Sequence, residues 1–291
     1  MRNDSEHSRI SGEGLRGLQL PSMARPNLSY LKNLLLFLFG VPLGLLTGLT
    51  GTAASVFAVP GVRSLLGLHP ARAIGTSLVV TFFAALASLL SFAQHDFLRG
   101  WLALALLVGL SVGKVLGQRV GRVPPLNWLW GTLLAAAGLA MIAQGLGFLP
   151  PITGHPLLTT IAPHTFLFLV FALVLTLVLG AISHWMGLGA ELLVPLEVYA
   201  LGLSPPLAIG TAILVLVLAS LPGVLLLLSR RQIEPQSATW LSFGGLLGGL
   251  AGAVWAVSLP NNFLVVLFGL LLAVLGVLRL WRREESVADT H

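Results

Sequence analysis

The sequence predicts an all-α polytopic membrane protein built of two inverted repeats. Each repeat has one broken, re-entrant helix hairpin and three full transmembrane helices, which gives about ten helical segments in all. Three observations lead to this fold class. First, the chain of 291 residues is 56% hydrophobic and 9% charged, with a mean hydropathy of +0.94. Soluble domains carry about 25% charged residues, so this chain has too little charge for a water-facing surface. The other two observations are long uncharged segments and an internal repeat.

Uncharged segments of membrane-spanning length follow one another along most of the chain. No Asp, Glu, Lys or Arg lies between Arg122 and Glu191 or between Glu234 and Arg279. A bilayer-spanning helix needs about 20 apolar residues. Full spans are therefore predicted at 72–94, 100–120, 127–148, 207–229, 237–257 and 262–281. The apolar runs do not alternate with polar residues, which argues against strands.

Two further regions, 33–68 and 163–203, are each too long for one span. Each contains a cluster of glycines and other small residues, Thr47–Thr52 in the first region and Ser183–Gly189 in the second. Glycine weakens a helix and frees its backbone polar groups, so we expect a break at each cluster. Each region is then predicted to form a hairpin that enters the membrane and returns to the same side.

A constant offset of 135 residues relates the two halves of the chain. It carries Gly67–Thr76 onto Gly202–Thr211. It also carries one ladder of glycines onto another, namely Gly109, Gly113 and Gly117 onto Gly244, Gly248 and Gly252. The four-residue spacing in these ladders is typical of close helix packing. The expected organisation is a polar tail (1–30), a first transmembrane repeat (31–150), a second transmembrane repeat (151–283) and a second tail (284–291).

The distribution of basic residues predicts the orientation. If both broken regions are hairpins and the N-terminus is cytoplasmic, the basic loops at 63–72, 114–122 and 230–234 lie inside with both termini. This agrees with the positive-inside bias. The alternative, one ordinary span for each broken region, would put the basic residues of the first two loops outside, so we favour the hairpins. An odd number of crossings in each half makes the repeats inverted.

The two returning helices are predicted to begin at mid-membrane with their N-termini pointing at a common centre. Helix N-termini carry unpaired N–H groups and about half a positive charge, which favours a bound anion. The alternative is that the glycines only allow tight packing. The predicted anion-binding residues are Gly51, Thr52, Ala53, Ser55, Thr76 and Ser77 in the first repeat and Gly187, Gly189, Ala190 and Thr211 in the second.

Ionisable residues inside the apolar segments are candidates for proton coupling. Glu191 is expected in the first turn of the second returning helix, where it either caps the helix or takes up a proton as the anion moves. His184 is either a proton donor or anion ligand, or a structural hydrogen-bonding group. Glu197, about two turns further on, is assigned no function. Lys114, near the cytoplasmic face, is expected to snorkel.

Both repeats carry a resemblance to a known family. Gly187–Pro195 followed by Ala208–Thr211 resembles the second-repeat signature of the TauE/SafE family of sulfite exporters and sulfonate permeases. Gly44–Pro60 followed by Ala73–Ser77 resembles its first-repeat signature, and the resemblance covers residues 34–280. It implies a multi-pass carrier of small sulfur-containing anions in the plasma membrane of a bacterium or archaeon. In one departure, the glycine triad expected after Gly51 reads Ala53-Ala54-Ser55, which narrows the anion site or changes its ligand.

The predicted function is that of a secondary transporter for sulfite or an organosulfonate, coupled to protons and embedded in the lipid bilayer, with a second copy of the chain as a possible partner. A passive anion channel on the same scaffold is the alternative. An intramembrane enzyme is a third candidate, but the sequence has no HExxH-type metal pair and no paired catalytic carboxylates. We expect no cofactor, no metal and no nucleic-acid partner. The absence of a P-loop excludes ATP-driven pumping by this chain alone, and the absence of cysteine excludes thiol chemistry.

Overall fold

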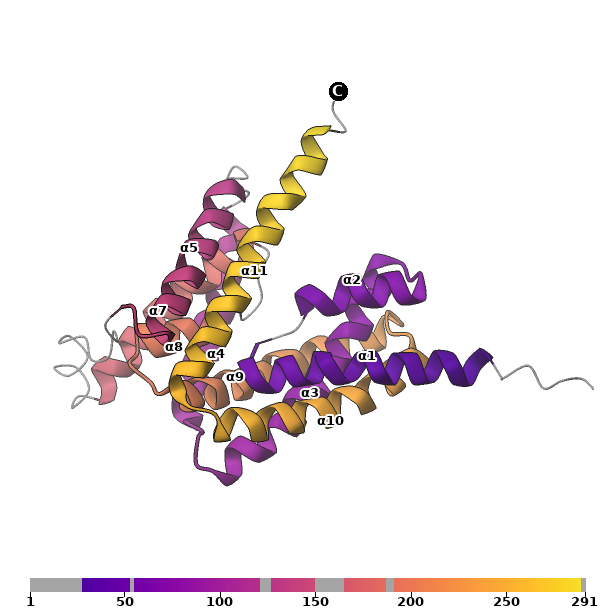
Figure 1. Cartoon of the computed structure of the whole chain (residues 1–291), viewed down its shortest axis with the longest axis horizontal. Helices are drawn as coiled ribbons and strands as arrows, with labels where there is room; N and C mark the ends of the chain where they lie inside the picture. The colour runs from indigo at the N-terminus through magenta and orange to yellow at the C-terminus, as the bar shows by residue number, and fades with distance from the viewer. Residues whose placement is uncertain (1–27, 53–54, 121–126, 150–164, 187–190, 289–291) are drawn as a thin grey trace, which may run out of the picture.

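The computed structural model describes residues 28–52, 55–120, 127–149, 165–186 and 191–288, and the regular elements within them are all α-helices (Figure 1). The first half of the chain forms α1 (Leu28–Thr50), α2 (Ser55–Leu66), α3 (Pro70–Gln94), α4 (Gly100–Val120) and α5 (Asn127–Gly145). The second half forms α7 (Thr165–Met186), α8 (Leu193–Tyr199), α9 (Pro205–Ser229), α10 (Pro235–Ser258) and α11 (Asn261–Ala288). The last helix therefore continues past residue 283, where the second tail was expected to begin.

Seven of these helices are long and apolar enough to cross a membrane: α1, α3, α4, α7, α9, α10 and α11. The prediction of an all-α polytopic membrane protein is thus confirmed. The apolar part of α5, Gly131–Gly145, is shorter than these spans. Large Leu, Val and Phe side chains are exposed along the outer faces of the long helices, as a lipid environment requires.

Each broken region consists of one long helix and one short helix, α1 with α2 and α7 with α8. The long arms continue through most of the small-residue clusters at which we expected the breaks. In α1 the helix persists because Gly48 packs against α10, and the Thr47 and Thr50 hydroxyls are satisfied within the helix by donating to the carbonyls of Leu43 and Leu46, at 2.9 and 2.6 Å. The break comes only after Thr50, where Gly51 has a positive φ of 61°.

The offset found in the sequence also relates the helices. Helix α3 begins at Pro70 and ends at Gln94, and α9 begins and ends 135 positions later, at Pro205 and Ser229. Helices α4 and α10 begin at the same offset, at Gly100 and Pro235. The repeated sequence therefore forms repeated structure.

Equivalent helices of the two halves run in opposite directions. Leu78 of α3 contacts Gly223 of α9, whereas Phe92, near the other end of α3, contacts Gly210 near the start of α9. Helices α5 and α11 are likewise antiparallel, because Gly131 packs near Gly276 and Gly145 packs near Asn262. Two equivalent pairs that are antiparallel require inverted repeats, as predicted.

The two repeats interlock through their glycine ladders. Helix α1 of the first repeat packs along α10 of the second, and α7 of the second packs along α4 of the first. Gly44 meets the backbone of Gly245, and Gly113 meets that of Leu177. The Ser88 hydroxyl of α3 adds a hydrogen bond of 2.9 Å to the carbonyl of Gly249 in α10. These contacts confirm the packing interpretation of both ladders.

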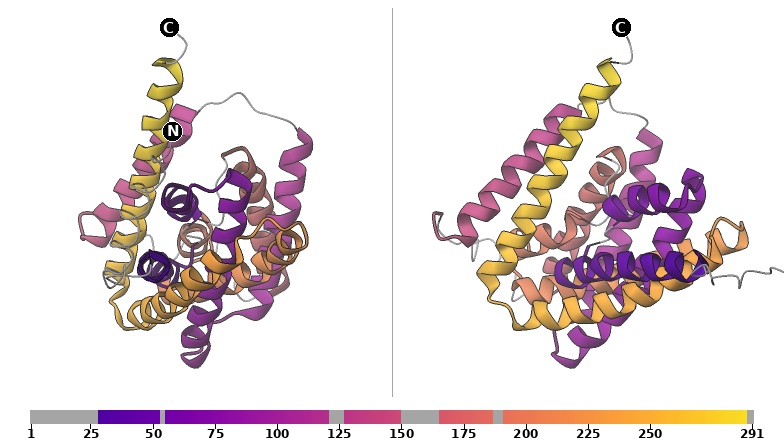
Figure 2. Two further views of the ribbon diagram at one scale, coloured as in Figure 1. Left: turned by 90° about the vertical axis from the view of Figure 1, so that its right-hand side faces the viewer. Right: turned by 45° about the vertical axis from the view of Figure 1, so that its right-hand side comes forward.

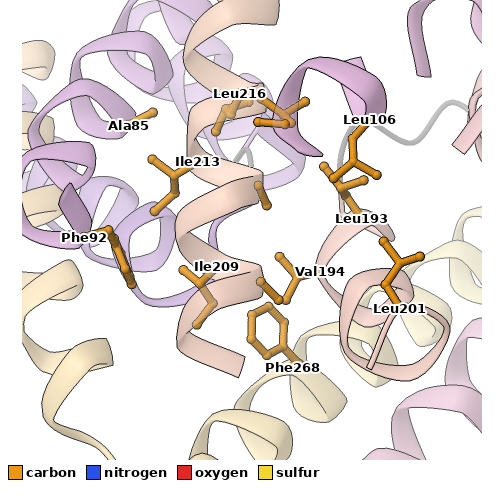
Figure 3. Close-up of a cluster of buried hydrophobic side chains, with 14 of the residues drawn as sticks. Ala85, Phe92, Leu106, Leu193, Val194, Leu201, Ile209, Ile213, Leu216 and Phe268 are labelled. Atoms are coloured by element: carbon orange, nitrogen blue, oxygen red, sulfur yellow. The ribbon is translucent and has the colours of Figure 1, made fainter. Parts of the chain in front are cut away.

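The main hydrophobic core lies where α8 meets the long helices (Figure 3). It gathers Leu106 of α4, Leu193 and Val194 of α8, Ile209 of α9 and Phe268 of α11, all buried. Helix α5 packs chiefly against α11, and this pair runs obliquely to the remaining bundle (Figure 2). The short helix of the second repeat is therefore held inside the bundle.

The close contact between Gly44 of α1 and Gly245 of α10 predicts how a substitution at Gly44 changes stability. A Cβ on Gly44 would lie 2.8 Å from the Cα of Gly245, so α1 and α10 must separate in Gly44→Ala. We expect a loss of about 1–3 kcal/mol of stability, the usual effect of overpacking, and a lower Tm in detergent. Gly100→Ala is the control, because the Cβ would meet open space. Equal Tm values for the two variants would contradict the close approach.

Candidate functional site

The first break is formed around Gly51, which is buried between α1 and α9. Its amide donates to the Thr47 carbonyl at 2.9 Å. Its positive φ is strained for any residue with a Cβ, and that Cβ would lie 2.9 Å from the Ile209 carbonyl oxygen. Glycine is required at this position for both reasons. The turn is thereby held against the first turns of α9.

The threonine hydroxyls at this break are already engaged. The oxygens of Thr50 and Thr52 lie 2.8 Å apart, and Thr50 donates its hydrogen to Leu46. Thr52 must therefore be the donor to Thr50, which uses the single hydrogen of its hydroxyl. Thr211 of α9 likewise donates to the Leu207 carbonyl at 2.8 Å. In this conformation, neither Thr52 nor Thr211 has a hydroxyl hydrogen left to donate to an anion.

The returning helix α2 starts close to the position predicted for it. Its first residue is Ser55, while Ala53 lies outside the described residues. Ala58 of α2 packs against Leu43 of α1, and Val62 packs near Leu36, so α2 runs back along α1. The neighbouring Gly44 packs on Gly245, halfway along α10. The N-terminus of α2 therefore lies near the middle of the bundle's depth.

The second break joins α7 to α8. Gly187, Gly189 and Ala190 lie outside the described residues. Glu191 lies in the turn before α8, where Leu192 holds the N-cap position, so it precedes the first helical turn in which it was expected. Its side chain is buried, at 2% exposure. A carboxyl group is thus enclosed by protein at the start of the second returning helix.

Lys114 of α4 is a half-buried positive charge whose ammonium group is attracted electrostatically by the Glu191 carboxylate. The backbone nitrogen of Lys114 lies 3.0 Å from the position of a Cβ on Gly180 of α7. The expectation that Lys114 simply snorkels missed this pairing, because contacts between the two repeats create it.

A sequence signal for Lys114 did exist. The repeat offset carries Lys114 onto Gly249, which packs its bare backbone against Ala84 in α3. A lysine at the equivalent position of the first repeat cannot pack in that way, and α4 makes much less contact with α9 than α10 makes with α3. Packing does not account for a charged residue that replaces a packing glycine in one repeat, and Lys114 marks a place where the symmetry of the two halves is broken.

His184 is not part of this buried group. It lies in the last turn of α7 beside Gly117 of α4, and its side chain is exposed. Ser77 of α3, another predicted anion ligand, is buried, and its hydroxyl has no hydrogen-bond partner among the described residues.

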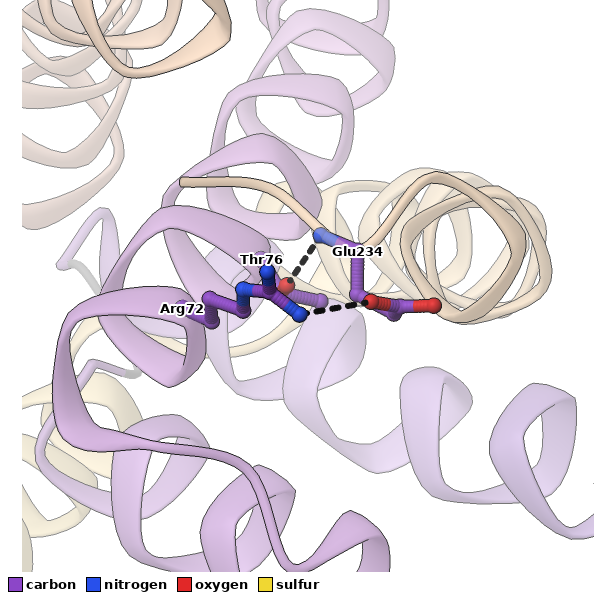
Figure 4. A network of polar contacts seen from close by, with 3 residues as sticks. All are labelled: Arg72, Thr76 and Glu234. Carbon is purple, nitrogen blue, oxygen red and sulfur yellow. Dashed lines mark hydrogen bonds and ion pairs between the residues drawn. The ribbon is translucent and has the colours of Figure 1, made fainter. Parts of the chain in front are cut away.

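Thr76 fastens a loop of the other repeat. Its hydroxyl oxygen accepts a hydrogen bond of 3.2 Å from the Glu234 amide, and Arg72 forms an ion pair of 3.8 Å with the Glu234 carboxylate (Figure 4). Since α3 and α9 are antiparallel, Thr76 and Thr211 lie toward opposite ends of this helix pair. Thr211 is near Gly51 and Thr76 is not, so the structure does not bring the two threonines to one site.

The glycines that precede Thr76 and Thr211 each pack against a loop of the other repeat. Gly75 packs against the carbonyl of Gln232 in the loop between α9 and α10. The equivalent Gly210 packs against the carbonyl of Phe97 in the loop between α3 and α4. The same offset carries Phe97 onto Gln232, so each repeat receives a loop of the other in the same way.

Glu197 of α8 is the most completely buried acid among the described residues, at 0% exposure. Neither of its carboxyl oxygens has a hydrogen-bond partner in the part of the chain that the structure describes. The sequence showed an acid within an apolar segment but gave no reason to prefer it over Glu191. Its enclosure depends on α9, the next helix along the chain, and on core residues of α4 and α11, which are distant in sequence.

Comparison with known proteins gives a consistent family match. The family model for sulfite exporter TauE/SafE matches residues 14–141 and 152–291. A probable membrane transporter protein of Xylella fastidiosa strain 9a5c is 28% identical over 253 residues, which cover 84% of this chain and 93% of that protein, and its counterpart in strain Temecula1 has the same values. A probable membrane transporter protein MamO of Magnetospirillum gryphiswaldense is 35% identical over 112 residues, which are 36% of this chain and 17% of MamO. No solved structure gives a significant match.

The Lys114–Glu191 pair predicts non-additive stability. Lys114→Met would remove the positive charge that attracts the buried Glu191 carboxylate, and a buried carboxylate that loses a nearby opposite charge destabilises the folded protein. We expect a lower Tm for Lys114→Met and a partial recovery in the double variant with Glu191→Gln. Lys32→Met removes an exposed lysine of α1 and serves as the control. Additive effects of the two substitutions would show that the groups do not interact.

Proposed function

Because the chain belongs to the sulfite exporter TauE/SafE family and is a membrane transporter, we propose that it carries sulfite or a small organosulfonate across the plasma membrane of a bacterium or archaeon. We further propose that this movement is coupled to protons. The observation that carries the proposal is a buried acid and a half-buried lysine, Glu191 and Lys114, placed between two inverted repeats beside a helix break. Ionisable groups inside membrane segments are expensive and mark substrate or proton pathways.

Main-chain groups and Lys114 would hold the anion. The twelve-residue helix α2 presents its N-terminus near the middle of the bundle, where its free N–H groups and dipole attract negative charge. The Thr52 and Thr211 hydroxyls donate within the protein, so they would contribute only after rearrangement. Broken helices that aim their N-termini at an anion are a recurrent feature of transporters with inverted repeats.

Glu191 would link the anion to the proton. While it is ionised, its carboxylate competes with the anion for the Lys114 ammonium group. Protonation removes this competitor, so the anion binds best when Glu191 carries a proton. The proton and the anion would then cross together, and a more acidic compartment on the loading side would promote uptake from that side.

The orientation can be tested by labelling, since the chain contains no cysteine. We propose that both termini are cytoplasmic. Ser204, before α9, and Arg119, at the end of α4, are both exposed. Ser204→Cys should react with an impermeant maleimide added to intact cells, and Arg119→Cys should react only after the membrane is opened. The reverse pattern would invert the orientation, and reaction of both from one side would contradict the proposed topology.

Transport itself is tested with sulfite in proteoliposomes, with and without a pH gradient. We expect saturable uptake that increases when the outer solution is acidic. Glu191→Gln should still bind and exchange sulfite but lose the response to the gradient, while Glu234→Gln, which alters a half-exposed loop acid away from both helix breaks, should keep that response. Flux that does not saturate would favour a passive channel. Unchanged pH dependence in Glu191→Gln would remove Glu191 from the coupling mechanism.

A further inference from the structure

Glu197 presents a buried carboxyl group to which the proposed mechanism gives no task. Its side chain has no exposed surface, and both carboxyl oxygens lack a hydrogen-bond partner among the described residues. Its neighbours on α8, Leu193 and Val194, are packed in the main hydrophobic core. Burial of a polar group without a partner is unfavourable, and burial of an unpaired charge is far more so.

Among the described residues, the helices around α8 offer Glu197 no compensating charge, since His184, the ionisable residue of α7, is exposed. Helices α5 and α9 contain no ionisable residue, and α11 contains none before Arg279. On α4, Lys114 is attracted by Glu191 instead, and Arg119 is exposed. On α8 itself, the hydroxyl of Tyr199 donates to the side-chain oxygen of Gln144 at 2.6 Å. A proton on the carboxyl is therefore the available means of neutralising Glu197 in this conformation.

We propose that Glu197 is a second proton-binding site of the transport cycle, loaded while α8 is packed in the core and released to water when α8 moves. This inference deepens the proposed function and rests on it. A leucine or methionine would fill such a core position without the penalty of an unsatisfied carboxyl, so packing alone does not account for an acid there. The step is a simple exchange, in which the carboxyl gives its proton to water on one side and later regains one from the other.

The attachment of α8 allows such a movement. The helix has seven residues, packs chiefly against α9, and is followed by a bend at Gly202 with a positive φ of 67°. Its C-terminal end is tied to α5 by the hydrogen bond between Tyr199 and Gln144. A helix of seven residues that is followed by a glycine with positive φ can shift as a unit, without the rearrangement of a whole transmembrane helix.

Infrared spectroscopy of the full-length protein in lipid tests the protonation directly and needs no substrate. We expect a carbonyl stretch from a protonated carboxyl at neutral pH, which is absent in Glu197→Gln and present in Glu234→Gln. A wild-type protein without this band, or a band that persists in Glu197→Gln, would overturn the proposal. Circular dichroism and Tm should confirm that Glu197→Gln is folded.

Sulfite accumulation then tests the role in transport. With the membrane potential clamped at zero, each coupled proton supports up to about tenfold accumulation per unit of pH gradient. Glu197→Gln should therefore accumulate about tenfold less sulfite than wild type while anion exchange continues. The protonation of sulfite in solution also changes with pH, but it affects the measurements on both proteins equally. Equal accumulation by the two would refute the role of Glu197. Absence of uptake by wild type, with the infrared band still lost in Glu197→Gln, would refute the proposed function and leave the proton site standing.

Discussion

Close approach of backbones between the two repeats is the constraint on which the rest of the structure depends. In lipid there is little hydrophobic drive for helices to associate, so contact area between small residues must supply the stability. Here the contacts cross from one repeat to the other, α1 with α10 and α7 with α4. The inverted relation of the repeats makes these pairs parallel, and the ladders at Gly44 and Gly113 keep them in register. Both helix breaks and the enclosed helix α8 are positioned by this exchange.

The fold could be predicted largely from sequence because its determinants are periodic and local. Apolar length, the constant offset and glycine spacing are all visible along the chain, and α3 and α9 match their predicted spans closely. The lengths of α1 and α7 could not be predicted in the same way. Glycine predicts a break from intrinsic propensity, but Gly48 stays helical because its missing side chain is used in packing against Gly249. Tertiary contact overrides propensity at that position.

The site residues remain predictions, and sequence alone is a weaker guide to them because the geometry of a site depends on which helices meet. Gly51 was identified correctly as a residue of the turn. A positive φ and a close backbone contact both require glycine, and a glycine is visible in the sequence. Thr76 and Thr211 share a motif, yet the inversion that relates their repeats places them toward opposite ends of α3 and α9. The surroundings of Lys114 depend on Glu191 in the second repeat, and the burial of Glu197 depends on how α8 packs in the core. No local pattern contains that information.

The reciprocal docking of loops has a consequence for biosynthesis. Gly75 in the first half needs the loop at Gln232, which is synthesised about 150 residues later at roughly 5–20 residues per second. Helix α7, which packs along α4, is complete before Gln232 is made, whereas α10, which packs along α1, is synthesised only after it. Helix α1 must therefore wait in the membrane with its glycine face uncovered. A nascent chain in this state is open to pairing with a neighbouring copy, so this architecture makes a demand on the cell during translation, before the folded transporter exists.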